Sequence, residues 1–246
     1  MKKAYKLLAK QEGISNKKAK ELIDRGLVYI LDRKVKIARA EVSEDTRFRI
    51  DSIDNIDIIY EDDNIIAVNK PPLLDSYEIL DIIDDKDIEL IHRLDRDTSG
   101  VLLLAKNRAF LKEAINAFRK KKVKKQYIAW IEGVFFEDIT INAPITTHKR
   151  GNKAFSKIDK KNGKPAITVV TPIEIQGKKS KVTIEIKTGR THQIRLHLSS
   201  IKHPIIGDER YGSVTRSKRI LLHAKAISIL GYEFEAKEPK DIIKYK

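Results

Sequence analysis

The stretch "IHRLDRDTSGVLLLAKN", residues 91–107, places charged side chains around one short turn and then enters an apolar run. Asp95 lies in this turn between Arg93 and Arg96, and the segment "VLLLAKN" that follows is predicted to be a short buried strand. The two arginines favour the ionised form of Asp95. A carboxylate held ionised beside a sheet can act as a nucleophile or a base, although the charge pattern alone fits a salt-bridged loop aspartate better.

The segments on either side of this turn predict strands with interspersed helices. Two strands are expected within 56–72 around a polar turn at 62–64, and alternating residues predict further strands in "KKQYIAWIEGVF" (124–135) and "KVTIEIKTGR" (181–190). Helical spacing predicts "RAFLKEAINAFRKK" (108–121), with Leu111, Ile115 and Phe118 on one face, and "THQIRLHLSSIKHP" (191–204). This mixture indicates an α+β domain over residues 51–246, with a mainly antiparallel mixed sheet flanked by helices.

Residues 1–50 form a separate, small α/β domain in this interpretation. A first short helix carries Tyr5 and Leu8, Ser15 is a suitable N-cap for a second helix, and Gly26 ends it. The segments "VYI" (28–30) and "VKI" (35–37), on either side of Asp32 and Arg33, then predict a small hairpin.

Composition and charge narrow the class of partner and the compartment. The chain has 246 residues, a formal net charge of +15 and no cysteine. The absence of cysteine excludes a disulfide framework and thiolate metal sites and favours a reducing compartment, so we expect a cytoplasmic protein. No signal sequence or membrane-spanning stretch is predicted.

The excess positive charge favours a polyanionic partner such as RNA. Residues 1–50 and 100–246 are basic, with balances of +7 and +19, whereas residues 51–99 carry a balance of −11. Two basic regions on either side of an acidic one indicate two separate nucleic-acid contacts. Apart from the lysine cluster "RKKKVKK" at 119–125, the chain has no low-complexity segment.

The literal string "HRLDRDTSG" (92–100) resembles the signature H-R-L-D-x-x-T-S-G of the RluA family of pseudouridine synthases. Further pieces resemble that family in the same order, and they are "DDNIIAVNKPP" (62–72), "KKQYIAWIEG" (124–133), "GKPAITVV" (163–170), "TGRTHQIRLHLSSIKHPIIGDERYG" (188–212) and "LLHA" (221–224). The resemblance covers residues 57 to about 236. Residues 1–50, with Lys17, Lys18, Lys20 and Arg25, resemble the small RNA-binding domain first recognised in ribosomal protein S-four, which these enzymes often carry in front.

The resemblance implies an enzyme that isomerises uridine in RNA by breaking the glycosidic bond, rotating the uracil and rejoining it through carbon 5. It implies Asp95 as the catalytic carboxylate, either as a nucleophile at the anomeric carbon or as a base that gives a glycal. Tyr127 matches the tyrosine that contacts the flipped base, and stacking suits it better than proton transfer because a phenol has a pKa near 10. Arg195 matches the partner of the catalytic aspartate, while Arg93 and Arg190 are expected to bind RNA. Arg93 fits a simple partner of Asp97 equally well.

The family uses no metal or organic cofactor, and we expect none here. His92, His192 and His197 fit no standard spacing of metal ligands. The chain departs from the family after "NKPP", where "LLDSYEILDIIDDKDIEL" (73–90) is short and acidic. Because of this departure, the resemblance does not predict the loop on the substrate side. We expect no effect on the matched catalytic positions.

Two functions remain at this point. The first is a pseudouridine synthase, with large-subunit ribosomal RNA as the favoured substrate and transfer RNA as the alternative. The second is a non-catalytic RNA-binding or ribosome-assembly protein on a synthase scaffold. The presence of Asp95, Tyr127 and Arg195 together favours catalysis, because binding alone does not need that trio. The resemblance also implies a monomer and no membrane contact.

Overall fold

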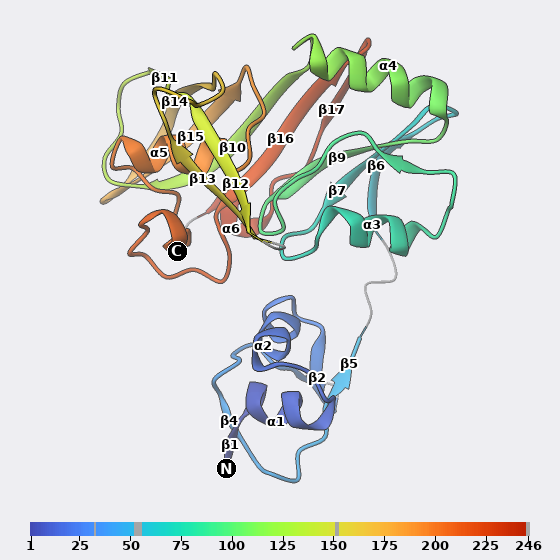
Figure 1. Cartoon of the computed structure of the whole chain (residues 1–246). Helices are drawn as coiled ribbons and strands as arrows, with labels where there is room; N and C mark the ends of the chain where they lie inside the picture. Colours follow the sequence, from blue (N-terminus) through green and yellow to red (C-terminus); the bar gives the residue numbers. More distant parts are fainter. Residues whose placement is uncertain (32, 52–55, 151–152, 245–246) are drawn as a thin grey trace. The chain divides into compact units, whose positions relative to one another are not determined.

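The computed structural model describes residues 1–31, 33–51, 56–150 and 153–244. The chain divides into two compact units, Met1–Asn55 and Ile56–Lys246 (Figure 1). The elements of the first unit are β1 (Lys2–Lys3), α1 (Ala4–Gln11), α2 (Asn16–Asp24), β2 (Val28–Ile30), β3 (Arg33–Lys34), β4 (Glu41–Val42) and β5 (Arg49–Ile50).

The first unit is built on the two predicted helices. Ser15 caps α2 by accepting a hydrogen bond from the Lys18 amide at 3.1 Å, and Gly26 takes a φ of +74° just beyond the helix, so both predictions are confirmed. The helices and β2 share a small apolar core that includes Leu8, Ile23 and Val28.

The predicted hairpin of this unit is wrong in its second strand. The return strand is β3 rather than residues 35–37, because Ile30 already pairs with Arg33 and Leu31 takes a left-handed φ of 53° in the tight turn. Val35 instead places its side chain in the core and donates its amide to the Val28 carbonyl. Asp32 lies outside the described residues.

The second unit is an α+β domain around a ten-stranded sheet. Its sheet strands are β6 (Asp57–Glu61), β7 (Ile65–Lys70), β8 (Glu89–Leu90), β9 (Ser99–Ala105), β10 (Lys124–Glu132), β11 (Ile139–Asn142), β14 (Ile167–Gln176), β15 (Lys179–Ile186), β16 (Leu222–Ile229) and β17 (Tyr232–Glu235). The remaining elements are α3 (Ser76–Ile83), α4 (Arg108–Arg119), the hairpin β12 (Ile145–Arg150) and β13 (Lys153–Ile158), α5 (Gln193–Ser200), a 3-10 turn (Glu209–Tyr211) and α6 (Lys240–Ile243).

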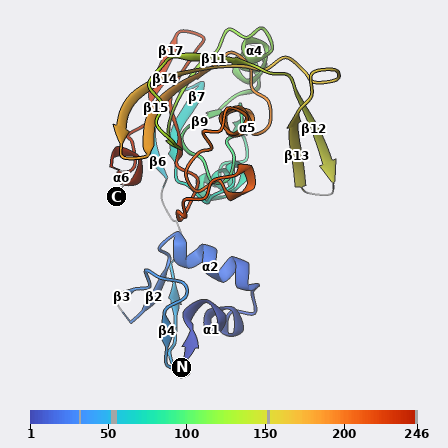
Figure 2. The same cartoon turned by 90° about the vertical axis from the view of Figure 1, so that its left-hand side faces the viewer.

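The sheet follows the order β11-β14-β15-β10-β16-β9-β7-β6, with β17 beside β16 and β8 beside β9. Among the described strands, β16 and β9 pair in parallel and their neighbours pair antiparallel, so the predicted mainly antiparallel mixed sheet is confirmed. The hairpin β12–β13 stands apart from this sheet (Figure 2).

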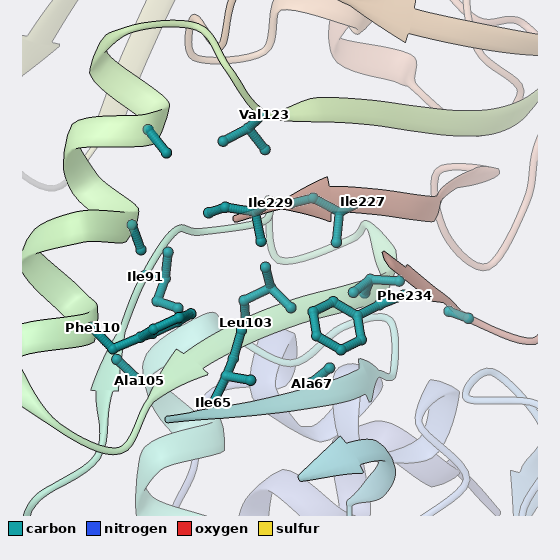
Figure 3. Close-up of a cluster of buried hydrophobic side chains, with 14 residues drawn as sticks. Ile65, Ala67, Ile91, Leu103, Ala105, Phe110, Val123, Ile227, Ile229 and Phe234 are labelled. Carbon is teal, nitrogen blue, oxygen red and sulfur yellow. The ribbon is translucent and has the colours of Figure 1, made fainter. Parts of the chain in front are cut away.

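Two apolar clusters cover the same face of the sheet. One lies under α4 and contains Leu103, Phe110 and Ile227 (Figure 3), and the other lies under α5 and contains Ala129 and Ile194. The pairing of β10 with β16 changes register between Gln126 and Tyr127, so Tyr127 opposes Ala224 whereas Lys125 opposes Ile227. Because of this shift, the side chains of both clusters lie on one face. The stretch of β10 around Lys125 and Tyr127 therefore lies between the two clusters.

Trp130 points to the opposite face of β10. It packs in a third cluster with Ile128 and Ile242, and its indole N–H donates to the Ile242 carbonyl at 2.9 Å. The alternation predicted for this strand is confirmed, since Ala129 and Ile131 lie in one cluster and Ile128 and Trp130 in another.

The buried face of α4 differs from the predicted one. Phe110, Ala114 and Ala117 are buried, whereas Ile115 is half exposed and Leu111 and Phe118 are only partly buried. The helix turns Phe110 and its two small alanines toward the sheet, where they join the apolar cluster. None of the helices in the described part of the chain is both long and apolar enough to cross a membrane.

Candidate active site

A cavity of about 620 Å³ opens between the two apolar clusters. Its walls come from the loop before β9, from β10, and from the turn that leads into α5. Asp95, Tyr127 and Arg195, which lie far apart in the sequence, all line it. Its volume is in the range of ligand pockets, and its lining combines apolar walls with a few charged groups.

The loop that carries Asp95 is fixed on both sides of this residue. The buried Ser76 hydroxyl accepts a hydrogen bond from the Leu94 amide and donates one to the Leu94 carbonyl, each at 3.1 Å. On the other side, Lys70 donates to the Arg96 carbonyl at 3.2 Å. The backbone of Asp95 is therefore held between two anchored neighbours.

Ser76 belongs to the acidic segment that the sequence left without a role. This segment forms α3, whose N-cap Asp75 makes a capping box with Glu78. Through Ser76 the segment contacts Leu94, the residue before Asp95, and so helps to hold the loop that carries Asp95.

Lys70 is fully buried beneath the same loop. Its ammonium also donates to the carbonyls of Pro71 and Leu74, at 2.9 and 2.8 Å. Burial lowers the pKa of Lys70 to about 7, against the opposing effects of Asp97 and Asp75. Sequence reasoning did not select this lysine, and the only signal was its place in the "NKPP" string.

Asp95 takes its ion pair from Arg195 on α5. The Arg195 Nη1 lies 3.1 Å from Asp95 Oδ2. Arg93, which neighbours Asp95 in the sequence, places its guanidinium 5.3 Å from the Tyr77 ring centroid. The fold therefore brings Arg195 and Asp95 into contact, a proximity that sequence spacing could not show.

Asp208 orients Arg195 from behind, and sequence reasoning missed it. Its two oxygens accept from Arg195 Nε at 2.7 Å and Nη2 at 2.9 Å, and both side chains are almost fully buried. Burial alone would lower the pKa of Arg195, but the hydrogen bonds and charge of Asp208, followed by Asp95, raise it above its ordinary value. Arg195 is therefore a fixed cation that donates one of its remaining N–H groups, on Nη1, to Asp95.

His192 forms the wall of the cavity beside this pair. It takes a left-handed φ of 55°, an uncommon conformation for a residue other than glycine, just where α5 begins. Its Nδ1 lies 2.9 Å from the Tyr211 hydroxyl and its Nε2 lies 3.9 Å from Asp95 Oδ2. Burial lowers the pKa of His192, against the opposing effect of Asp95.

Tyr127 lines the cavity from β10. Burial, with a further effect of the Asp95 charge, raises the pKa of its phenol well above the ordinary value. The phenol is therefore protonated at neutral pH, and this state favours a contact with a nucleobase over a role as the group that removes a proton.

The residues predicted to bind RNA are divided between the two units. Arg93 and Arg190 both line the cavity, and the Arg190 side chain donates to the Pro165 carbonyl at 3.2 Å. Tyr77, which sequence reasoning missed, adds an exposed ring next to Arg93.

In the first unit, Lys17 and Lys18 are exposed on α2, and the Lys20 ammonium lies 4.4 Å from the Tyr5 ring centroid. Arg25 is less suited to an RNA contact, because its side chain is almost buried and lies 3.6 Å from Glu21.

The histidines named in the sequence have partners other than a metal ion. His92 Nε2 accepts the Leu103 amide, and His197 contacts Thr168 and the Ala143 carbonyl. In the ranges that the structure describes, no group of three or more histidine, aspartate or glutamate side chains is arranged to hold a metal ion.

Comparison with known proteins identifies the fold and its chemistry. A family described as RNA pseudouridylate synthase matches residues 64–200, which include Asp95, Tyr127 and Arg195. The chain belongs to this family. Its members are isomerases, and the matched residues all lie within the second unit of the chain.

Curated relatives and a solved structure that are similar to this RNA pseudouridine synthase carry related names. It is 51% identical to a protein of Helicobacter pylori (strain J99) named "Uncharacterized RNA pseudouridine synthase", over 98% of this chain and 99% of that protein. It is 36% identical to "Ribosomal large subunit pseudouridine synthase C" of Buchnera aphidicola (subspecies Baizongia pistaciae), over 79% of this chain and 68% of that protein. Among solved structures, human "RNA Pseudouridylate Synthase Domain Containing 1" is similar, with a TM-score of 0.66 and 29% identity over 78% of this chain and 86% of that one.

Proposed function

We propose that this synthase isomerises uridine in large-subunit ribosomal RNA and that Asp95 is its catalytic carboxylate. The observation that carries the assignment of Asp95 is its ion pair with Arg195 inside a cavity that Tyr127 also lines. Arg195 holds the carboxylate in a fixed orientation, so that it can attack the anomeric carbon or remove a sugar proton. Both routes need the same carboxylate.

Tyr127 is proposed to contact the uracil after the nucleotide leaves its stack. An aromatic ring on a fixed strand offers a flat surface to the base, and its protonated hydroxyl adds a hydrogen-bond donor. Arg93 and Arg190, at the same cavity, are proposed to contact the RNA around the extruded nucleotide.

Ribosomal RNA is favoured as the substrate by the names of the relatives. The Buchnera aphidicola relative and one from Haemophilus influenzae, 31% identical over 82% of this chain, are named as ribosomal large subunit pseudouridine synthases. The net charge of +15 suits any structured RNA, so charge does not distinguish ribosomal from transfer RNA.

Residues 1–50 are proposed to be an RNA-binding domain like that of ribosomal protein S-four, with residues 51–246 as the catalytic domain. Support comes from two short helices and a small hairpin with exposed Lys17 and Lys18. Replacing both lysines by glutamine should reduce the dependence of RNA affinity on salt, because each phosphate contact contributes about 0.7–0.9 to the slope of log K against log salt. An unchanged slope in a binding titration would remove this helix from the RNA contact.

The substrate is tested by release of tritium from RNA labelled at carbon 5 of uracil, because rejoining through that carbon expels its hydrogen. Separate large-subunit, small-subunit and transfer RNA transcripts are incubated with the enzyme. We expect release from large-subunit RNA alone. Release from transfer RNA alone would reassign the substrate, and release from none of them would contradict action on free RNA.

A further inference from the structure

Lys125 lines the active-site cavity, and the chemistry above gives it no role. It lies two residues before Tyr127 on β10, and because successive strand residues alternate, both side chains point to the same face. This is the face between the two apolar clusters, where the cavity opens.

The Lys125 ammonium is a partly buried cation with apolar neighbours. It lies 5.5 Å from the Phe118 ring centroid. A side chain at Gly189 would bring its Cβ within 3.6 Å of the same Nζ, so the ammonium also lies beside the backbone of the turn before α5. Burial lowers the pKa of Lys125, and its positive charge contributes to the lowered pKa of His92.

No carboxylate within the described ranges lies at ion-pair distance from Lys125, whereas Arg195 in the same cavity has two such partners. A partly dehydrated ammonium without an anion is unfavourable, since the Phe118 ring replaces only part of the interaction that it has lost with water. Its position is therefore suited to an anion that arrives with the substrate. In RNA, the anions are the backbone phosphates.

We propose that Lys125 binds the RNA phosphate that flanks the flipped uridine. This inference rests on the proposed function, which places the uridine beside Asp95 and Tyr127. Lysine acts as a point charge toward phosphate, and the open side of its ammonium needs no fixed geometry. The contact anchors the backbone where the nucleotide leaves the helical stack, while Tyr127 on the same strand receives the base.

The test combines a neutral phosphate with a neutral side chain. A short RNA containing the target uridine is prepared with its natural backbone and with a single uncharged methylphosphonate on either side of that uridine. Dissociation constants are measured for the wild-type protein, Lys125→Gln and Lys124→Gln. Lys124 is the matched control, because it is the preceding residue of β10, exposed, and outside the cavity lining.

For the wild-type protein and for Lys124→Gln, we expect one of the two methylphosphonates to weaken binding about 10-fold or more, as expected when a charged hydrogen bond is lost. For Lys125→Gln, the same methylphosphonate should change the affinity less than twofold. If both positions weaken binding of wild-type and Lys125→Gln equally, Lys125 does not contact a flanking phosphate and the inference is overturned.

Two further measurements separate a phosphate contact from an effect on folding or on catalysis. Lys125→Arg should restore the sensitivity to the methylphosphonate, whereas an effect on folding alone would not depend on the RNA backbone. Isomerisation of the natural RNA, followed with the same protein preparations, tests the proposed function separately. A protein that binds this RNA without isomerising it contradicts the proposed function, while the phosphate comparison still decides the role of Lys125.

Discussion

At the scale of single residues, the site is a chain of charges from Asp208 through Arg195 to Asp95. Asp208 accepts two of the five guanidinium N–H groups, and a third, on Nη1, is donated to Asp95. The desolvation of these groups is compensated by close ion pairing. Arg195 is therefore held in place beside Asp95 and keeps its charge.

Asp208→Asn should lower kcat while the affinity for RNA changes little. The substitution removes one of the two charges that fix Arg195, so Asp95 loses its orientation, and we expect a decrease of about 10- to 100-fold, or about 1.4–2.8 kcal/mol. Asp241→Asn is the matched control, since Asp241 binds Arg219 through two 2.7 Å hydrogen bonds outside the cavity lining. Equal losses of kcat in the two variants would show that the effect is general rather than local.

The sequence identified Asp95 and its expected partner Arg195, because both lie in literal strings. It could not identify Asp208, Lys70 or Ser76, since their roles depend on contacts made by the folded chain. Asp208 and Lys70 lie within strings that resemble the family, but an aspartate beside a turn and a lysine before two prolines are common in proteins of every function. The candidate site residues can therefore be predicted from local sequence more easily than the residues that position them.

At the scale of elements, the loop that carries Asp95 leads directly into β9, which lies very close to β16 at Gly100. Gly100, the last residue of the signature, has a φ of +112°, and a Cβ there would lie 2.1 Å from the Ala224 carbonyl oxygen. These strands make the parallel pairing of the large sheet. Only glycine allows this contact directly after the loop that carries Asp95.

Gly100→Ala should lower the free energy of unfolding by more than about 3 kcal/mol, because the strands must separate or the backbone must change conformation. Unfolding in urea is followed by the fluorescence of the single tryptophan, Trp130, which is buried in the second unit. Gly177→Ala is the control, since Gly177 also has a positive φ but no atom within 4 Å of an added Cβ, and its cost should be about 1 kcal/mol. Equal costs would contradict the proposed role of the contact.

The elements themselves were predicted well where the pattern was long and regular. The alternation in β10 and β15 and the spacing in α5 gave the correct type of structure. The prediction for the buried face of α4 was wrong because it chose the large apolar residues, whereas two alanines are buried there. Helix α3 was missed because its acidic residues obscured a short apolar stripe, although its capping box is readable in the sequence.

At the scale of the whole molecule, buried neutral histidines should make folding sensitive to acid. Burial lowers the pKa of His92 to about 4, with a smaller effect of Lys125, and burial also lowers the pKa of His223 to about 4. An unfolded histidine titrates near 6.5, so between about pH 6.5 and pH 4 the unfolded chain binds more protons than the folded one. The stability that these two neutral histidines contribute is therefore present above pH 6.5 and is lost as the pH falls from 6.5 to 4.

Each of these histidines should remove about 2 kcal/mol of stability at pH 5 relative to neutral pH. The free energy of unfolding, measured in urea at pH 7 and pH 5, should fall in the wild-type protein. It should fall less in His92→Gln, which keeps an acceptor for the Leu103 amide but does not titrate. A pH dependence identical to that of the wild-type protein would show that His92 does not remain neutral in the folded state.

The most direct measurement of the central claim is a single-turnover comparison of the wild-type protein and Asp95→Asn on RNA with uracil labelled at carbon 5. The substitution keeps the shape of the side chain and its contact with Arg195 but removes the charge that either chemical route needs. We expect tritium release by the wild-type protein, no detectable release by Asp95→Asn, and RNA affinities within a few-fold of each other. Release by Asp95→Asn at the wild-type rate would contradict the assignment of Asp95 as the catalytic carboxylate.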